Sequence, residues 1–215
     1  MDGAEQPSVN PELLAWQTGP EEVFASGQIN GTNGLRLERS VLFVKPHYWI
    51  VADWVFGSGQ HEVTRLFHFP LDSAVQATVN GAQTRYTSGA NLEVLPADDA
   101  RLEMRQGWVP TGQASAREGP VAALVIRRML PAALGTVLVP FAQEKTFPTV
   151  KRVSHANPEL VQIQVTFPNG QQDDVLIAPA PAKLALGEHI DSGRALVVRR
   201  GPSGETTIVV KGEGR

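Results

Sequence analysis

Histidine side chains are the first candidates for chemistry in this sequence, because they bind metals and move protons near neutral pH. The chain has five histidines and no cysteine. The histidines are His47, His61, His68, His155 and His189. None belongs to a His-x-His or His-Glu-x-x-His motif. His61 and His68 lie in one strand-like run, but they are seven positions apart and therefore point to opposite faces of the strand. The sequence therefore predicts no metal site and no cofactor, and it excludes thiolate zinc sites and cysteine nucleophiles.

One carboxylate stands inside an apolar run, and it is the most informative single residue. Asp53 interrupts the segment Tyr48 to Phe56, which is otherwise apolar on both faces. A buried carboxylate is costly unless it is paired, and Arg39 or Arg65 on a neighbouring strand could pair with it. We expect a structural ion pair whose loss in Asp53→Asn costs about 3 kcal/mol or more. A ligand or cleft role is the alternative, because perturbed carboxylates also mark functional sites.

Two further side chains could contact a ligand. Trp108 adjoins a polar segment and could stack on a sugar ring, although packing in the core is the more common use of an indole. His68 is expected to be buried and bonded within the sheet, with a position on a cleft face as the alternative. The candidate ligand-binding residues are therefore Arg39, Asp53, His61, His68 and Trp108. No catalytic residue is predicted, and no serine lies in a Gly-x-Ser-x-Gly motif.

The elements that must position these residues are strands. Three runs, 35–44, 48–56 and 61–69, follow one another and are separated by a Lys-Pro turn and a Gly-Ser-Gly turn. The middle run is apolar on both faces, which predicts an interior strand covered on both sides. We therefore expect the three runs to lie side by side as a β-meander at the centre of the fold.

Turn signals divide the rest of the chain. Asn80-Gly81, Pro168 to Gly170 and Gly201 to Gly204 predict hairpin turns. The segment Pro110 to Gly119 reads as a polar loop, and the prolines of Ala178 to Lys183 (APAPAK) argue against a central strand there. Counting these runs gives roughly a dozen strands and no convincing helix.

Composition sets the class of the protein. The 215 residues are 42% hydrophobic and 19% charged, with a net charge of -3. They fit one large all-β domain about as well as two small ones, and we expect a single antiparallel stacked-sheet β-sandwich over residues 1–215. The charge gives no reason to expect nucleic acid as a partner. No apolar run approaches the roughly 20 residues of a membrane helix, and the acidic N-terminus lacks the features of a secretory signal.

Short motifs within this framework resemble a known family. The residues RSVLFV (39–44), YWIVAD (48–53), His61 and LFH (66–68) are similar to the C-terminal β-sheet domain of heparinase II/III-like polysaccharide lyases. Further similarity comes from DGAEQ (2–6), Gly107-Trp108, Leu130-Pro131 and TVLVP (136–140). The likeness extends from Met1 to about Phe141.

The resemblance implies a stacked-sheet domain that packs beside an N-terminal helical toroid. In the family, glycosaminoglycan-like chains bind between the two parts, and β-elimination occurs beside a uronic acid. The family's zinc ligands and most catalytic groups would lie upstream of Met1, so we expect this chain to support the cleft and to be inactive alone. A periplasmic or extracellular location and an acidic polysaccharide as partner are also implied. Tyr48, one of two tyrosines, is expected to be packed rather than catalytic.

Two alternatives from other classes remain open. The chain could be a free-standing carbohydrate-binding β-sandwich that holds acidic polysaccharide through arginines and an exposed tryptophan. It could also be an intact enzyme of another type, although no catalytic constellation is visible in the sequence. Glycan binding distinguishes a purely structural piece from a binding module.

Overall fold

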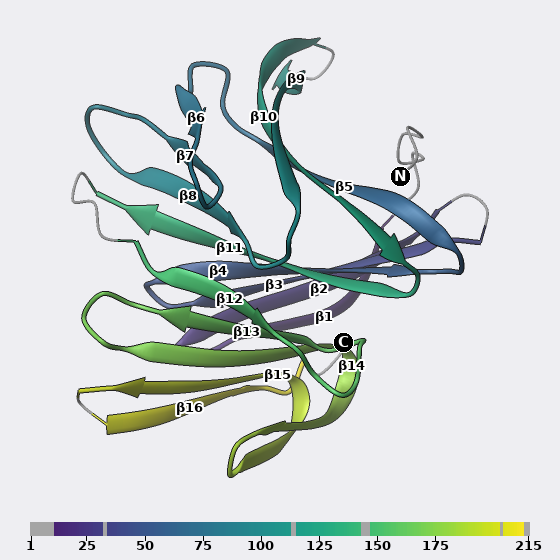
Figure 1. Cartoon of the computed structure of the whole chain (residues 1–215), viewed down its shortest axis with the longest axis vertical. Helices are drawn as coiled ribbons and strands as arrows, with labels where there is room; N and C mark the ends of the chain where they lie inside the picture. Colours follow the sequence, from purple (N-terminus) through teal and green to yellow (C-terminus); the bar gives the residue numbers. More distant parts are fainter. Residues whose placement is uncertain (1–10, 32–33, 113–114, 143–146, 203, 213–215) are drawn as a thin grey trace.

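Antiparallel strands make up almost all of the computed structural model (Figure 1), which describes residues 11–31, 34–112, 115–142, 147–202 and 204–212. The motif at 2–6 lies outside the described residues. These residues contain sixteen strands and no helix, so the all-β prediction is confirmed and the strand count is higher than expected. The strands are β1 (Glu12–Thr18), β2 (Glu22–Asn30), β3 (Arg36–Val44), β4 (Tyr48–Phe56), β5 (Gln60–His68), β6 (Val75–Ala77), β7 (Ala82–Thr84), β8 (Asn91–Pro96), β9 (Arg101–Gly112), β10 (Ser115–Met129), β11 (Ala132–Phe141), β12 (Thr149–Val153), β13 (Val161–Thr166), β14 (Gln172–Leu186), β15 (His189–Gly201) and β16 (Gly204–Val210).

The strands form three stacked sheets. An eight-stranded sheet, in the order β1-β2-β3-β4-β11-β8-β7-β6, lies between a three-stranded sheet (β5-β10-β9) and a five-stranded sheet (β12-β13-β14-β15-β16) (Figure 1). The largest core cluster joins the eight-stranded and five-stranded sheets, and two smaller clusters join the other face of the eight-stranded sheet to the three-stranded one. The predicted stacked-sheet sandwich is confirmed.

Strand β4 occupies the centre of this stack, as its two-sided apolarity predicts. It pairs with β3 on one side and β11 on the other. Ile50 and Trp54 face the five-stranded sheet, while Val55 faces the three-stranded sheet. Beside it, Gly135 of β11 leaves room for the five-stranded sheet, because a Cβ there would lie only 2.6 Å from Cδ1 of Ile163.

The third run of the expected meander leaves this sheet, so that part of the prediction is wrong. Strand β5 pairs with β10 and not with β4. The Gly-Ser-Gly turn makes the change of direction possible, because Gly59 has a φ of +87°, which other residues rarely adopt. Strand β5 therefore crosses above the eight-stranded sheet and opens the three-stranded layer (Figure 1).

Two other segments also differ from expectation. Residues 110–119, expected as a loop, belong mostly to a long β9–β10 hairpin. The APAPAK segment lies within β14, but pairing with β15 is interrupted between Ile177 and Ala182. The prolines occupy this interruption, where the missing N–H donors break no ladder bond. The Pro168–Gly170 and Gly201–Gly204 turns connect paired strands as predicted.

A buried polar contact ties two layers together. The Tyr48 hydroxyl donates a hydrogen bond of 2.8 Å to Asp173 of β14, and both residues are fully buried. Arg199 of β15 holds the same carboxylate through Nε and Nη2, the latter at 2.8 Å. Burial, reinforced by Asp173, raises the pKa of Tyr48 well above its ordinary value, so the phenol remains a donor. Tyr48 is therefore structural, as predicted.

Candidate functional site

The predicted ion pair of Asp53 is present, and its partner is Arg39. The guanidinium donates Nε to Oδ1 at 2.6 Å and Nη2 to Oδ2 at 3.1 Å. The Arg39 side chain is 48% exposed, whereas the Asp53 side chain is 12% exposed. The cation is thus not buried, and the expected cost of about 3 kcal/mol for removing the carboxylate is too high for a half-exposed pair.

The alternative partner, Arg65, is used elsewhere. Its side chain is almost fully buried between the layers, where Nη1 donates to the carbonyl of Gly135 at 2.9 Å and to Thr136 Oγ1 at 2.7 Å. The second terminal nitrogen of Arg65, Nη2, lies 3.7 Å from the carboxylate of Asp98. Arg65 is therefore a structural link between β5 and β11.

The two candidate histidines lie apart from this ion pair. His61 lies at the start of β5, and its Nε2 is 3.0 Å from the carbonyl of Ser58 in the preceding turn. His68 is exposed at the other end of the strand. The expectation of a buried His68 is wrong, because its alternate position in β5 points away from the core.

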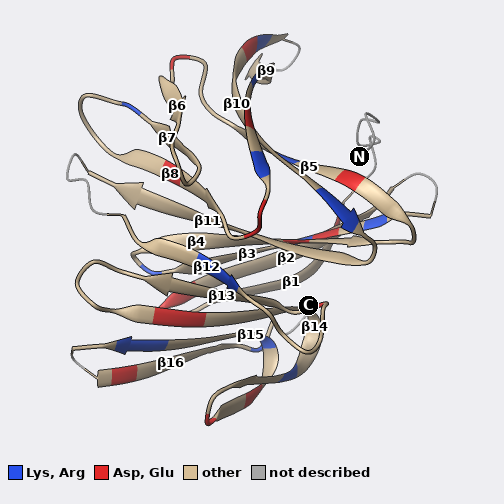
Figure 2. Ribbon diagram, in the orientation of Figure 1, with Lys and Arg blue, Asp and Glu red and all other residues tan. Residues whose placement is uncertain are grey.

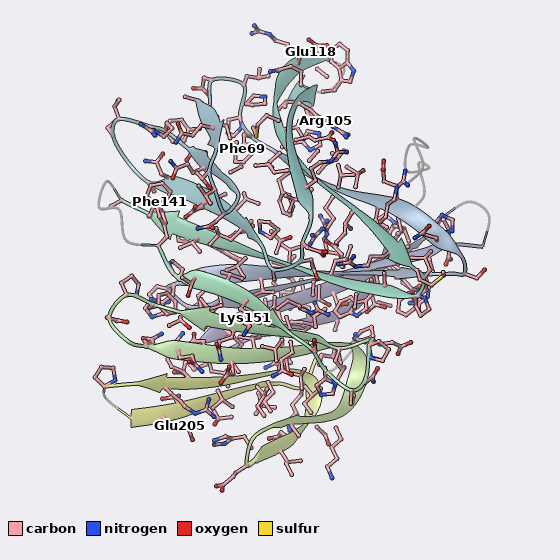
Figure 3. All side chains as sticks on the ribbon, viewed as in Figure 1. Phe69, Arg105, Glu118, Phe141, Lys151 and Glu205 are labelled. Carbon is pink, nitrogen blue, oxygen red and sulfur yellow. The ribbon has the colours of Figure 1, made fainter. Side chains whose placement is uncertain are left out.

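His68 belongs to a surface that we call the outer strip, the face of the three-stranded sheet turned away from the core. Register places His68, Val121 and Arg105 in one row across it. Figure 3 shows Arg105 on the opposite side of the β9–β10 hairpin from the core residue Phe69. The outer strip consists of Glu62, Thr64, Leu66, His68, Arg101, Glu103, Arg105, Val121, Ala123, Val125 and Arg127.

The outer strip has an apolar floor with charged edges. Its central residues Val121, Ala123 and Val125 are at most 5% exposed. Along β9, Arg101 lies 2.6 Å from Glu103, and Arg105 pairs with the same carboxylate. The hydrogen bond from Arg105 lowers the pKa of Glu103 below its ordinary value. Two arginines therefore share one acid, which leaves positive charge along this edge.

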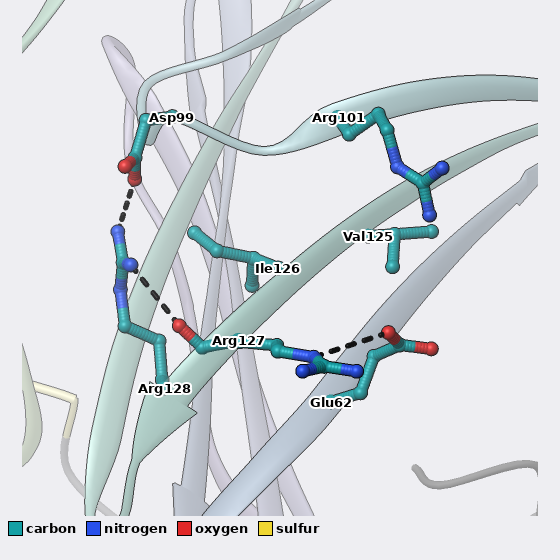
Figure 4. A pocket seen from close by; sticks show the side chains of 7 residues that line it. All are labelled: Glu62, Asp99, Arg101, Val125, Ile126, Arg127 and Arg128. Atoms are coloured by element: carbon teal, nitrogen blue, oxygen red, sulfur yellow. Dashed lines mark hydrogen bonds and ion pairs between the residues drawn. The ribbon is translucent and has the colours of Figure 1, made fainter.

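A pocket of about 420 Å³ lies at one end of the outer strip (Figure 4). Three arginines and two carboxylates line it together with two apolar side chains. Arg128 pairs with Asp99, and Arg127 lies 3.7 Å from Glu62. Arg128 holds the pKa of Asp99 below its ordinary value. The lining residues are Glu62, Asp99, Arg101, Val125, Ile126, Arg127 and Arg128.

The charge of this pocket suits an anionic group. Arginine excess attracts anions, and guanidinium forks bind carboxylate or sulfate oxygens in pairs. Figure 2 shows the basic C-terminal end of β10 beside the acidic segment of β5. Sequence reasoning missed Arg101 and Arg127, although Arg127-Arg128 marked the charged end of an apolar strand. Their meeting depends on pairing between β9 and β10, which the sequence did not indicate.

Trp108 lies outside the outer strip. It is 67% exposed, so packing in the core is excluded. It pairs with Glu118 in the β9–β10 hairpin, three positions from Arg105 and hence on the opposite face. The structure therefore does not bring together the five predicted ligand-binding residues. That Trp108 stacks on a sugar ring stays a prediction.

No group of three or more metal-ligating side chains comes together within the described ranges. The described residues also contain no helix long and apolar enough to cross a membrane. Tyr86, the second tyrosine, contacts the hydroxyl of Ser73.

Comparisons with known proteins agree with the architecture. No family model matches the sequence, and no curated protein matches it. Heparan sulfate lyase HepC from Pedobacter heparinus is similar in structure, with a TM-score of 0.65 and 18% identity over 79% of this chain. A heparinase III gene product has a TM-score of 0.64 with 17% identity over 80% of this chain, and another heparinase III structure has 0.62 with 16% over 75%.

This chain spans 28%, 28% and 26% of the length of those three proteins. Identity at this level establishes the fold alone. Together with the motifs in its central strands, the comparison identifies the chain as a heparinase-like β-sheet fold.

Proposed function

We propose that this chain is the β-sheet domain of a polysaccharide lyase that acts on uronic-acid-containing glycans, and that its outer strip contacts the acidic polysaccharide. The observation that carries this proposal is the structural likeness to heparan sulfate lyase and heparinase III, which covers about four fifths of the chain. The arginine-lined pocket supports the proposal, because its three guanidiniums outnumber its two carboxylates and so favour an anionic ligand.

The outer strip would act by holding negative groups of a linear glycan. Arg101 and Arg127 extend from neighbouring strands on either side of Val125 (Figure 4). Their present acidic partners are partly exposed and lie at the surface, where such pairs contribute little. A glycan carboxylate or sulfate could therefore compete for them with small cost. His68 and Arg105 extend the same surface along the sheet.

Catalysis by this chain alone is not part of the proposal. Elimination needs a base, an acid and neutralisation of the uronate, and Tyr48 is unavailable because it is fully buried. Positioning of substrate between two bodies supplies much of the rate. We therefore place the base, the zinc site and a helical toroid in a larger protein, at a periplasmic or extracellular location, with residues 1–215 as one domain.

Binding is tested by calorimetry with heparan sulfate, hyaluronan, alginate and neutral dextran. We expect binding of the acidic glycans, weakening with salt, and none of dextran. Arg101→Gln with Arg127→Gln should weaken binding about tenfold. Arg85→Gln, an exposed arginine after β7, is the matched control. Equal affinity of the double variant and the control contradicts the role of the outer strip.

Activity is tested separately with the same glycans. We expect no rise in the ultraviolet absorbance of the unsaturated product and no stoichiometric zinc by elemental analysis. A steady rise proportional to protein concentration would instead show an intact enzyme.

A free-standing carbohydrate-binding module is the second candidate. The exposed Trp108 favours it, because an indole with 67% exposure offers a stacking face. Trp108→Ala then lowers affinity for every glycan, neutral ones included. Loss confined to acidic glycans in the arginine double variant favours the lyase domain.

A further inference from the structure

The proline segment of β14 builds a second pocket, far along the chain from the outer strip. Strand β14 pairs Ile177 with Ala195, and the next pair is Ala182 with Gly193. Four residues of β14 therefore stand opposite the single residue Arg194. This bulge leaves a pocket of about 490 Å³ beside it. The lining residues are Pro181, Ala182, Lys183, Ser192, Gly193, Lys211 and Gly212.

The rim of this pocket carries two lysines. Lys183 stands opposite Ser192 in the pairing of β14 with β15. Lys211 follows β16 and contacts Asp191, with a further hydrogen bond of 3.0 Å to the carbonyl of Ser192. Asp191 is the acid that offsets the two ammonium groups, and its pKa is held below the ordinary value by Lys211. The rim thus has an excess of one positive charge.

A buried guanidinium lies behind the pocket wall. The Arg194 side chain is 9% exposed and donates Nη1 to the carbonyl of Pro179 in the bulge. Its Nε has no hydrogen-bond partner among the described residues. A Cβ on Gly212, a residue of the pocket wall, would lie 3.3 Å from that Nε, so the guanidinium lies close behind the wall.

The charge of Arg194 is only partly neutralised. Among the described residues its carboxylate partner is Glu38, which is 3.7 Å away and nearly fully buried. Glu38 also holds Arg36 at 3.0 Å, so two guanidiniums share one acid. A buried donor without a partner is costly, and the positive field of Arg194 adds to that of the lysines on the rim.

We propose that this bulge pocket binds a tetrahedral oxyanion, a sulfate or phosphate group. Such a group has several strong acceptor oxygens and carries negative charge, which match the net positive rim and the field of Arg194. Small residues on the wall favour close approach of the anion to the backbone. At Gly193 a Cβ would lie 2.3 Å from the Val210 carbonyl, so no side chain can fill the pocket from there. The site is independent of the proposed polysaccharide function.

The test is titration of the ¹⁵N-labelled protein with inorganic sulfate and inorganic phosphate at constant ionic strength. We expect saturable shifts of the amide signals of Lys183, Ser192 and Gly193. Lys183→Met should raise the dissociation constant about tenfold, since the lysine supplies a charged contact and makes no described bond that folding needs. Lys151→Met, an exposed lysine on β12, is the matched control and should bind as the parent does.

Two more ligands identify the source of the group. Glucosamine 6-sulfate and glucose 6-phosphate represent sulfated glycans and phosphate esters, and the tighter of the two assigns the natural class. Shifts that do not saturate, or equal dissociation constants for Lys183→Met and Lys151→Met, overturn the proposal. A dissociation constant for acetate equal to that for sulfate also overturns the proposal, because the pocket would then select negative charge and not tetrahedral shape.

Discussion

Replacing Asp173 by asparagine should destabilise the protein far more than the same change at Asp53. Both carboxylates accept hydrogen bonds from Nε and Nη2 of an arginine, so the two substitutions remove the same chemical group. Asp173 is fully buried, and its partner Arg199 has a side chain only 18% exposed. Asp53 instead faces a guanidinium that is 48% exposed.

The magnitudes follow from what each substitution leaves behind. In Asp173→Asn, Arg199 keeps its charge in a poorly solvated place and the Tyr48 hydroxyl loses an anionic acceptor, which should cost about 3–5 kcal/mol. In Asp53→Asn, Arg39 turns to water, and the cost should be about 1 kcal/mol. Tyr48→Phe, which removes one hydrogen bond and leaves the ion pair, should also cost about 1 kcal/mol.

Urea unfolding followed by tryptophan fluorescence measures these differences, since urea leaves ion pairs unscreened. The midpoint of Asp173→Asn should fall well below those of the other two variants. The reasoning is refuted if Asp53→Asn lowers the midpoint as much as Asp173→Asn does. Far-ultraviolet spectra before unfolding check that each variant is folded.

Three other predictions concern single residues. Glu93 is 3% exposed, and burial raises its pKa from 4.5 to about 7. Between these two pH values the folded state binds a proton that the unfolded state has released, so stability should fall by up to about 3 kcal/mol as the pH rises from 4.5 to 7. Urea midpoints measured across that range should show this fall, and Glu93→Gln should abolish it. Gly135→Ala should cost about 1–2 kcal/mol, because its Cβ would press on Ile163, and a thermal midpoint equal to that of the parent contradicts the close approach. Trp108→Ala should change stability by less than about 0.5 kcal/mol, and a larger loss in a thermal melt shows that the exposed indole has a packing role.

The sequence predicted the features that local pattern controls. Two-sided apolarity identified β4 as an interior strand, and Pro-Asn-Gly at 168–170 identified a hairpin turn. The isolated carboxylate in β4 correctly implied an ion pair, because burial of a charge requires one. The choice of Arg39 over Arg65 as the partner depends on how the strands pair and in which register, and the hydrophobic pattern does not give either.

What the sequence missed depends on contacts between distant strands. The polar residues 110–119 look like a loop because the end of the β9–β10 hairpin has no buried face. His68 looked buried because its run is apolar, but β5 is an edge strand with one open face. The segment 12–30, weak in alternation, forms the paired strands β1 and β2.

The candidate site was the least predictable part. Its arginines come from β9 and β10, and nothing in either run indicates that the two strands are partners. The sequence also does not distinguish exposed charged residues that lie together on the folded surface from those that lie apart.

The position of β11 has a consequence for how the chain folds. This strand completes the centre of the eight-stranded sheet by joining β4 to β8, yet β5 to β10 separate it from β4 in the chain. A pairing between such distant segments requires closure of a long loop before it gains any contact energy. The hairpins β2–β3, β9–β10 and β15–β16 can form locally at once. The middle of the molecule, the most buried part of the finished structure, should therefore be the last part of the sheet to assemble.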